Sequence, residues 1–112
     1  MKISEFIKGM NWGYVGYRGE YRTSEANSSL EKLANLGTNW VCICFSVPQE
    51  TWASTRIWFD YKRTVTDLDI QHAVRKAHDL GMKVCLMPVV DPTDHIWRGR
   101  IDFPDSGVIV IN

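Results

Sequence analysis

The stretch Trp40-Val41-Cys42-Ile43-Cys44-Phe45 decides the fold, because it is apolar without interruption. A strand of an antiparallel sheet with one face in water would alternate apolar and polar residues, and this stretch does not. An unbroken apolar run is typical of a parallel strand that is buried on both faces. We therefore predict a buried parallel strand over residues 39–46, with Pro48 helping to end it.

A second apolar run, residues 84–90, is preceded by a sequence similar to the one before the first run. Leu36-Gly37 precedes the first run and Leu80-Gly81 precedes the second, and the two passages lie roughly 44 residues apart, a reasonable length for one βα repeat with a long loop. Pro88 counts against the second strand, because a proline removes one donor from the ladder of hydrogen bonds. We still predict another buried strand, ending at Asp91-Pro92.

Two helical patterns separate the strands. The first begins near Thr23 or Ser24, either of which can cap a helix, and the second begins at Thr66, with Asp69 placed as in a capping box. A short strand near residues 6–13 precedes both. The order strand, helix, strand, helix, strand predicts a parallel sheet with right-handed crossovers.

An open doubly wound sheet and a (β/α) barrel both accept this order. The open sheet usually binds nucleotides at a glycine-rich first turn, but Gly13, Gly16 and Gly19 do not have the nucleotide-binding spacing, and no phosphate loop is present. Aromatic residues at strand ends and a long second loop favour the barrel. We predict an α/β fold: one partial domain over residues 1–112, a parallel βαβαβ segment with about three of the eight strands of a TIM barrel.

Composition excludes several classes of function. Thirteen Lys and Arg balance 13 Asp and Glu, so the chain has no basic excess with which to bind nucleic acid. No apolar run is long enough to span a membrane, and the N-terminus lacks the apolar core of a signal peptide. The three cysteines lie in apolar runs, which argues against a disulfide framework and for a reducing, cytoplasmic location. The sequence predicts no metal site and no cofactor.

The working face of a parallel barrel lies at the carboxyl ends of its strands. Tryptophan rings stack on the apolar faces of sugars, and amide, carboxylate, imidazole and guanidinium groups hydrogen-bond sugar hydroxyls. This rule selects residues after each of the three strands, including Phe45, Ser46 and Gln49 after the second. From the selection we take six candidate substrate-binding residues: Asn11, Trp12, Asp91, His95, Trp97 and Arg98. Plain alternatives exist for several of them. The two tryptophans could be packing residues, Asp91 could cap a turn, and Arg98 could form a structural ion pair.

Three segments give a more specific indication. Lys8-Gly9-Met10-Asn11-Trp12, the segment over residues 77–84, and above all Trp97-Arg98-Gly99-Arg100-Ile101 resemble the opening of glycoside hydrolases of the β-mannanase-like family 113. The resemblance extends over roughly residues 6–104. It implies a (β/α)8 barrel that cleaves β-linked oligo- or polysaccharides with retention of configuration. It also implies a sugar-binding role for five of the candidates: Asn11, Trp12, Asp91, Trp97 and Arg98.

The same resemblance implies that the two catalytic glutamates lie at the ends of strands four and seven, for which this chain has no matching positions. Retaining hydrolysis needs two carboxyl groups about 5–5.5 Å apart, so we assign no catalytic residue and expect the chain alone to be inactive. Residues 106–112 form an atypical tail, for which we expect a premature stop, a frameshifted gene or a cut chain.

Two further expectations accompany this reading. A three-stranded parallel sheet has an open edge, so we expect the isolated chain to self-associate through that edge or to be marginally stable. The alternative to a hydrolase fragment is a small α/β carbohydrate-binding or protein-interaction module that uses its tryptophans as a contact surface.

Overall fold

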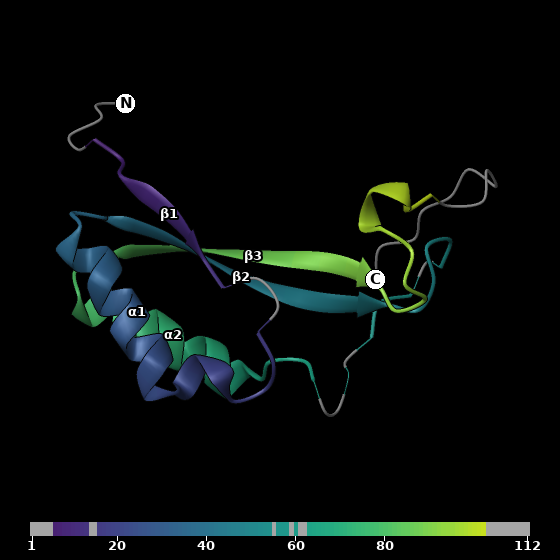
Figure 1. Ribbon diagram of the computed structural model, residues 1–112, viewed down its shortest axis with the longest axis horizontal. Helices are drawn as coiled ribbons and strands as arrows, with labels where there is room; N and C mark the ends of the chain where they lie inside the picture. The colour runs from purple at the N-terminus through teal and green to yellow at the C-terminus, as the bar shows by residue number, and fades with distance from the viewer. Residues whose placement is uncertain (1–5, 14–15, 55, 59, 61–62, 103–112) are drawn as a thin grey trace.

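The computed structural model describes residues 6–13, 16–54, 56–58, 60 and 63–102. Its three strands, β1 (Gly9–Trp12), β2 (Trp40–Gln49) and β3 (Lys83–Pro92), form one parallel sheet in the order β1-β2-β3 (Figure 1). Helix α1 (Ser24–Asn35) connects β1 to β2, and α2 (Asp67–Asp79) connects β2 to β3. The predicted βαβαβ order and parallel sheet are therefore confirmed. The tail over residues 106–112 lies outside the described residues.

The helix boundaries follow from capping chemistry. The side chain of Thr23 accepts a hydrogen bond from the backbone N–H of Ala26 at 3.1 Å. At α2, Thr66 accepts from the N–H of Asp69 at 3.2 Å, and the Asp69 carboxylate accepts from the N–H of Thr66 at 2.8 Å. The capping box is thus complete although aspartate replaces the usual glutamate or glutamine. After each helix, Gly37 and Gly81 adopt the left-handed conformation that glycine favours.

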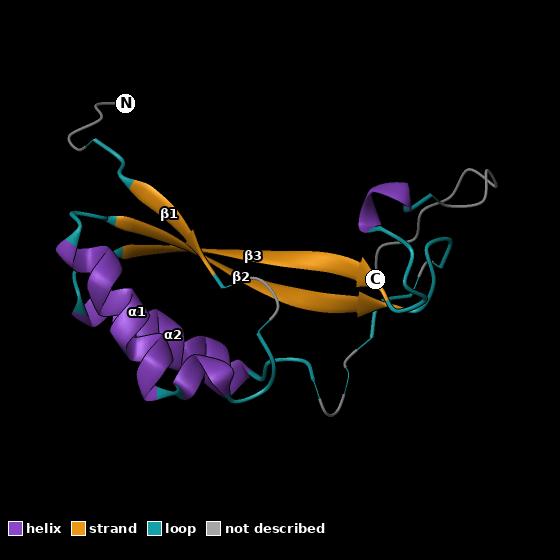
Figure 2. Ribbon diagram, viewed as in Figure 1, coloured by secondary structure: helices purple, strands orange, loops and turns teal. Residues whose placement is uncertain are grey.

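Both helices cover the same face of the sheet (Figure 2). The core lies between these two layers and consists of Tyr21, Leu30, Val41, Ile43, Val65, Ala73, Ala77 and Met82. The expectation that β3 is buried on both faces is wrong, since Cys85 is exposed and Met87 retains 38% of its accessible surface. The physical reason is that no described element covers the face of the sheet opposite the helices.

Pro48 does not end β2 as the sequence suggested, whereas β3 ends at Pro92 as predicted, despite Pro88. β2 continues through Pro48 to Gln49, and β3 continues through Pro88, which pairs in register with Phe45. In the described sheet β3 is an outer strand, so Pro88 has one side without a partner strand. β1 ends opposite Ile43, before Pro48, and the neighbour of Pro48 beyond that point is Trp58, whose N–H donates to the Pro48 carbonyl at 2.9 Å. A proline is tolerated there, because its missing N–H removes no ladder bond.

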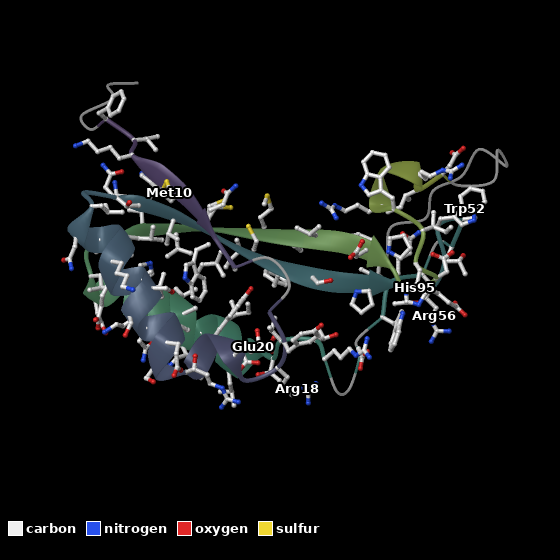
Figure 3. The ribbon with its side chains drawn as sticks, in the orientation of Figure 1. Met10, Arg18, Glu20, Trp52, Arg56 and His95 are labelled. Atoms are coloured by element: carbon white, nitrogen blue, oxygen red, sulfur yellow. The ribbon has the colours of Figure 1, made fainter. Side chains whose placement is uncertain are left out.

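Beyond the helices, β2 and β3 project together toward the loops that follow them. At that end lie the long loop after β2, the loop after β3 and a one-turn 3-10 helix, η2 (Arg98–Arg100). Trp52, Arg56 and His95 gather there, away from Met10 (Figure 3). Among the described residues, no helix has the length and apolar character needed to cross a membrane.

Candidate functional site

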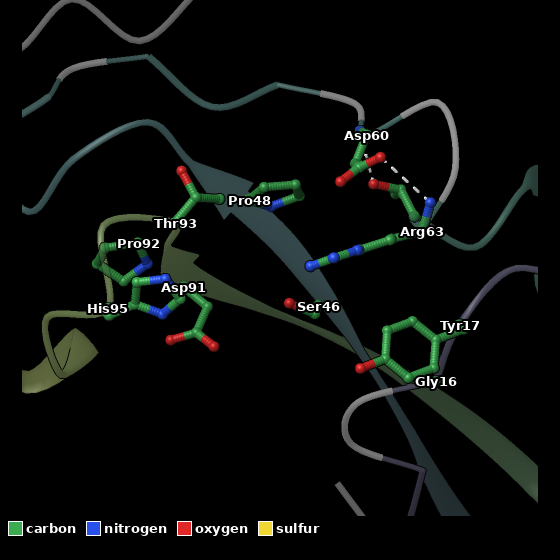
Figure 4. A pocket seen from close by; sticks show the side chains of 11 residues that line it. Gly16, Tyr17, Ser46, Pro48, Asp60, Arg63, Asp91, Pro92, Thr93 and His95 are labelled. Carbon is green, nitrogen blue, oxygen red and sulfur yellow. Dashed lines mark hydrogen bonds between the residues drawn. The ribbon is translucent and has the colours of Figure 1, made fainter.

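A cavity of about 220 Å³ lies at the carboxyl ends of β2 and β3 (Figure 4). Ser46 and Pro48 contribute from β2, and Asp91, which pairs in register with Pro48, contributes from β3. The complete lining is Gly16, Tyr17, Ser46, Pro48, Asp60, Arg63, Thr64, Asp91, Pro92, Thr93 and His95. Parallel pairing thus brings residues distant in sequence to one edge of the sheet, which is where parallel α/β folds place their ligands.

The wall opposite Asp91 is built by two loops that are tied together. The backbone N–H of Arg18 donates to the carbonyl of Arg63 at 3.0 Å, and the Arg18 Nε donates to the carbonyl of Thr64 at 3.3 Å. These bonds join the loop after β1, which carries Tyr17, to the end of the loop after β2, which carries Arg63. The Arg63 side chain extends into the cavity above Ser46 (Figure 4).

Asp94 fixes the remaining wall. Its carboxylate accepts one hydrogen bond from the N–H of Trp52 at 3.1 Å and another from the N–H of Ile96 at 3.2 Å. Between these anchors, His95 has φ 66° and is the one non-glycine residue with positive φ in the described part of the chain. Histidine tolerates this conformation better than most residues, and such backbone strain concentrates at functional sites. Asp94 therefore holds His95 at the cavity in a conformation that it would rarely adopt unaided.

The cavity offers a mixture of hydrogen-bonding groups. Asp91 supplies a carboxylate, Arg63 a guanidinium, His95 an imidazole, and Tyr17 and Ser46 supply hydroxyls. Prolines at positions 48 and 92 provide apolar wall between these groups. Donors and acceptors of both kinds around a partly apolar hollow suit a neutral ligand that carries many hydroxyl groups.

The structure separates the six predicted site residues. Asp91 and His95 line the cavity together, whereas Asn11, Trp12, Trp97 and Arg98 do not. Trp97 and Arg98 lie just beyond His95, at η2, where Trp97 is 68% exposed and Arg98 is partly buried.

The two predicted residues of β1 point to opposite faces of the sheet. Trp12 lies on the helix side, where its Nε1 donates to the Ser29 hydroxyl at 2.7 Å and its ring contacts Tyr21 at a centroid distance of 4.7 Å. Asn11, its neighbour on an alternating strand, therefore lies on the helix-free face, in register with Cys42. In this structure the contacts of Trp12 are therefore those of a packing residue, which was the alternative to a sugar-binding role.

The six candidates do not include Tyr17, Ser46 and Arg63, which also line the cavity. The strand-end rule did select Ser46, at the end of the apolar run of β2, but Ser46 was not kept among the six. Tyr17 lies among closely spaced glycines, which marks a loop but not its direction. Arg63 carried no signal, since its position depends on how a long irregular loop folds back.

The Cys42 thiol, on the helix-free face, is poorly suited to metal binding. Burial, together with the neighbouring thiols of Cys85 and Cys44, raises the pKa of Cys42 to about 11. The thiolate is the form that binds metals and attacks electrophiles, so Cys42 is unreactive near neutral pH. In the ranges that the structure describes, no group of three or more His, Cys, Asp or Glu side chains is arranged to hold a metal ion.

Comparison with known proteins identifies the family. The family model of Glycoside Hydrolase Family 113 matches residues 10–111. The chain is 41% identical to the GH113 β-mannanase AaManA from Alicyclobacillus acidocaldarius, solved in complex with ManMIm, with a TM-score of 0.80 over 88% of this chain and 31% of that one. No curated protein matches the chain.

Two further solved structures give the same result. A GH113 β-1,4-mannanase solved as a complex is 28% identical with a TM-score of 0.79, and another GH113 β-1,4-mannanase structure is 29% identical with a TM-score of 0.78. Each match covers 93% of this chain and 34% of the other, so the chain spans about a third of the length of these relatives. The prediction of a three-stranded segment of a TIM barrel is confirmed. The chain belongs to glycoside hydrolase family 113.

Proposed function

We propose that the cavity at the ends of β2 and β3 is part of a cleft that binds β-linked mannan oligosaccharides. The observation that carries the proposal is that Asp91 and His95, selected from the sequence as sugar-binding residues, line one cavity with Tyr17 and Arg63. The solved relatives are named as β-mannanases, and we take the identity of the sugar from these names. The membership in a glycoside hydrolase family supplies the class of ligand.

In this proposal each side chain has a distinct task. The Asp91 carboxylate accepts hydrogen bonds from two sugar hydroxyls, while Arg63 donates to hydroxyl or ring oxygens from the opposite wall. His95 contributes one donor or acceptor, according to its tautomer. Asn11 contacts substrate deeper on the helix-free face, and Trp12 supports that contact from the core side without touching sugar.

We infer further that this chain binds sugar without hydrolysing it. Hydrolysis with retention of configuration needs two carboxyl groups about 5–5.5 Å apart, one as the nucleophile and one as the acid/base. The cavity contains two carboxylates, but Asp60 is engaged in its own loop, where its Oδ1 accepts from the Arg63 N–H at 3.2 Å. Asp91 remains, and one carboxylate cannot perform both steps. Binding without turnover also describes the carbohydrate-binding module that was the alternative from sequence.

A titration with β-1,4-mannobiose tests the proposal. Backbone amide signals of residues around the cavity should shift in the unmodified chain, and Asp91→Ala should weaken the apparent affinity by about tenfold, as expected for the loss of hydrogen bonds to a charged group. Asp79→Ala, a matched change at an exposed position at the end of α2, should leave binding unchanged.

Two results would contradict the proposal. The first is a titration in which mannobiose produces no shifts around the cavity at any concentration. The second is equal weakening of binding by Asp91→Ala and Asp79→Ala. Release of reducing sugar from mannotetraose by the purified chain would separately refute the inference that it does not hydrolyse.

We also propose a reducing, cytoplasmic location. Its support is that Cys42, Cys44 and Cys85 are all free thiols in the structure. Fractionation of the producing cells with an antibody to the chain tests it, and recovery of the chain from the medium or the cell envelope would contradict it.

A further inference from the structure

Two of the three cysteines lie side by side on neighbouring strands. Cys42 of β2 pairs in register with Cys85 of β3. Val41 and Ile43, which flank Cys42, are fully buried in the core on the helix side, and Val84 packs against the same core. Because side chains alternate along a strand, both thiols point to the face of the sheet opposite the helices. Parallel pairing thus brings together two thiols that are distant in sequence.

The spacing of the strands suits a bond between these two sulfurs. Neighbouring strands lie about 4.8 Å apart, and the Cα atoms of residues joined by a disulfide usually lie about 4.4–6.8 Å apart. The linked Cβ atoms lie at about 3.5–4.5 Å, so the bond needs a small approach of the strands. β3 is the outer strand of the described sheet, and it can make this approach without displacing a further strand.

The two thiols differ in exposure, which gives them different tasks. Cys85 is exposed, so an oxidant from solution reaches it first. Cys42 is partly buried, and burial with a hydrogen bond to the Cys85 thiol raises its pKa to about 11. Its thiolate fraction at pH 7 is therefore about one in ten thousand, which makes it slow toward reagents in solution. The Cys85 sulfur, however, is held beside it, and such proximity is equivalent to an effective concentration of about 10⁵–10⁸ M.

Cys44 is a poorer partner for either thiol. It follows Cys42 by two residues on the same strand, which puts their Cα atoms about 6.6 Å apart, at the long end of the disulfide range. It is 2% exposed, and its thiol donates to the Cys42 carbonyl at 3.6 Å. Its register partner on β3 is Met87. The geometry therefore favours the pair Cys42–Cys85 over the other two pairings.

We propose that Cys42 and Cys85 are a site of reversible oxidation, at which hydrogen peroxide converts the two free thiols into a disulfide that joins β2 to β3. The Cys85 thiolate attacks one peroxide oxygen, so that an S–O bond forms, the O–O bond breaks and hydroxide leaves. The Cys42 thiolate then attacks the Cys85 sulfur, so that the S–S bond forms, the S–O bond breaks and a second hydroxide leaves. The protons released by the two thiols convert both hydroxides to water. The sulfurs together lose two electrons, and these reduce the peroxide.

The bond has a measurable consequence for stability. It closes a loop of about 44 residues, from position 42 to position 85, and so restricts the unfolded chain more than the folded one. The oxidised chain should therefore melt about 10 °C above the reduced chain. The small approach that the strands must make strains the bond, and strained disulfides are readily reduced. This inference does not depend on the proposed sugar binding.

Peptide mapping identifies the bond. The reduced chain is treated with an equimolar amount of hydrogen peroxide, the remaining thiols are blocked with iodoacetamide in denaturant, and the chain is digested with trypsin without reductant. Mass spectrometry should find the peptide of residues 33–56 joined to the peptide of residues 84–98, and dithiothreitol should separate them. Cys44→Ala, a matched change on the same strand, should still give the linked peptides. Cys42→Ser and Cys85→Ser should give none, and peroxide should not raise their melting temperatures.

Three results would overturn the proposal. The first is oxidation of Cys85 to sulfinic acid in the unmodified chain without any linked peptide. The second is the same linked peptide in Cys42→Ser, which would make Cys44 the partner. The third is a link only between two copies of the chain, seen as a reducible dimer on a non-reducing gel. Far-UV circular dichroism of each reduced variant checks that the substitutions preserve the fold.

Discussion

Replacement of Asp69 by asparagine should destabilise the chain far more than the same replacement at an exposed position of the helix. Asp69 lies at the third position of α2 and is fully buried. Its Oδ2 accepts from the N–H groups of Thr66 at 2.8 Å and Gly19 at 3.2 Å, and its Oδ1 accepts from the Arg22 Nε at 2.6 Å. The carboxylate thus fastens the loop after β1, which carries Tyr17 into the cavity, to the start of α2.

The magnitude follows from these contacts. An asparagine can keep its oxygen toward Gly19 and Thr66, but its amide group then faces Arg22 and that bond is lost. Arg22 is nearly half exposed, so solvent screening limits this loss to about 1 kcal/mol. The two retained bonds become bonds between neutral groups and weaken by about half, which costs about 0.5–1 kcal/mol each. Asp69→Asn should therefore reduce the free energy of unfolding by about 2–3 kcal/mol.

The effect should depend on pH. Burial alone would raise the pKa of Asp69, but hydrogen bonds from Thr66, Gly19 and Arg22 outweigh it and hold the pKa below the ordinary value of 3.8. A carboxyl with a depressed pKa stabilises the folded state fully above its unfolded-state pKa. This stabilisation is lost as the pH falls from about 3.8 through the lower folded-state pKa. The stability curves of the two proteins should converge in that range.

Urea denaturation, followed by circular dichroism at several pH values, measures both predictions. Asp67→Asn is the matched control, because Asp67 lies in the same helical turn and carries the same charge but is exposed. The reasoning is refuted if Asp69→Asn costs no more than Asp67→Asn at pH 7. It is also refuted if the difference between Asp69→Asn and the unmodified chain stays constant well below pH 3.8.

Gly16→Ala should lower the free energy of unfolding by about 1–3 kcal/mol, because a methyl group there would overlap the buried ring of Tyr21. Thermal melting measures this, with Gly9→Ala, where the methyl meets only ordinary contacts, as the control that should be near neutral. Iodoacetamide at pH 8 should modify exposed Cys85 well before Cys42, whose pKa is raised to about 11, and equal rates by mass spectrometry would contradict this. The chain should also self-associate, because Met10, Leu86 and Met87 are exposed on strands, and a monodisperse monomer at high concentration by light scattering would count against that expectation.

The order of elements could be predicted from sequence because each rests on local chemistry. The apolar run of β2, the threonine caps at positions 23 and 66, and the glycines after each helix depend on near neighbours only. The end of β2 was misplaced near Pro48, and Pro88 was wrongly counted against β3, since whether a proline is tolerated depends on which strands lie beside it. Burial of β3 was overestimated because an apolar run does not reveal whether another element covers both faces of the sheet, and no described element covers the face opposite the helices.

The candidate site was predictable only in part. Asp91 and His95 were found because they lie at the end of a strand or just after it, and the rule about strand ends needs no tertiary information. Trp12 satisfies the same rule, but one step along a strand turns a side chain to the other face, and the sequence does not fix which face β1 presents. Arg63 enters the cavity through backbone bonds between two loops, which no pattern of residues near position 63 reveals.

The central claim is that the carboxyl ends of β2 and β3, with the loops around them, form a binding site for a β-linked mannan chain. A crystal structure of this chain grown with β-1,4-mannotriose tests it most directly. We predict sugar density in contact with Asp91, His95 and Arg63 on the walls of the cavity. A well-ordered sugar bound elsewhere, with the cavity occupied by solvent alone, would contradict the account.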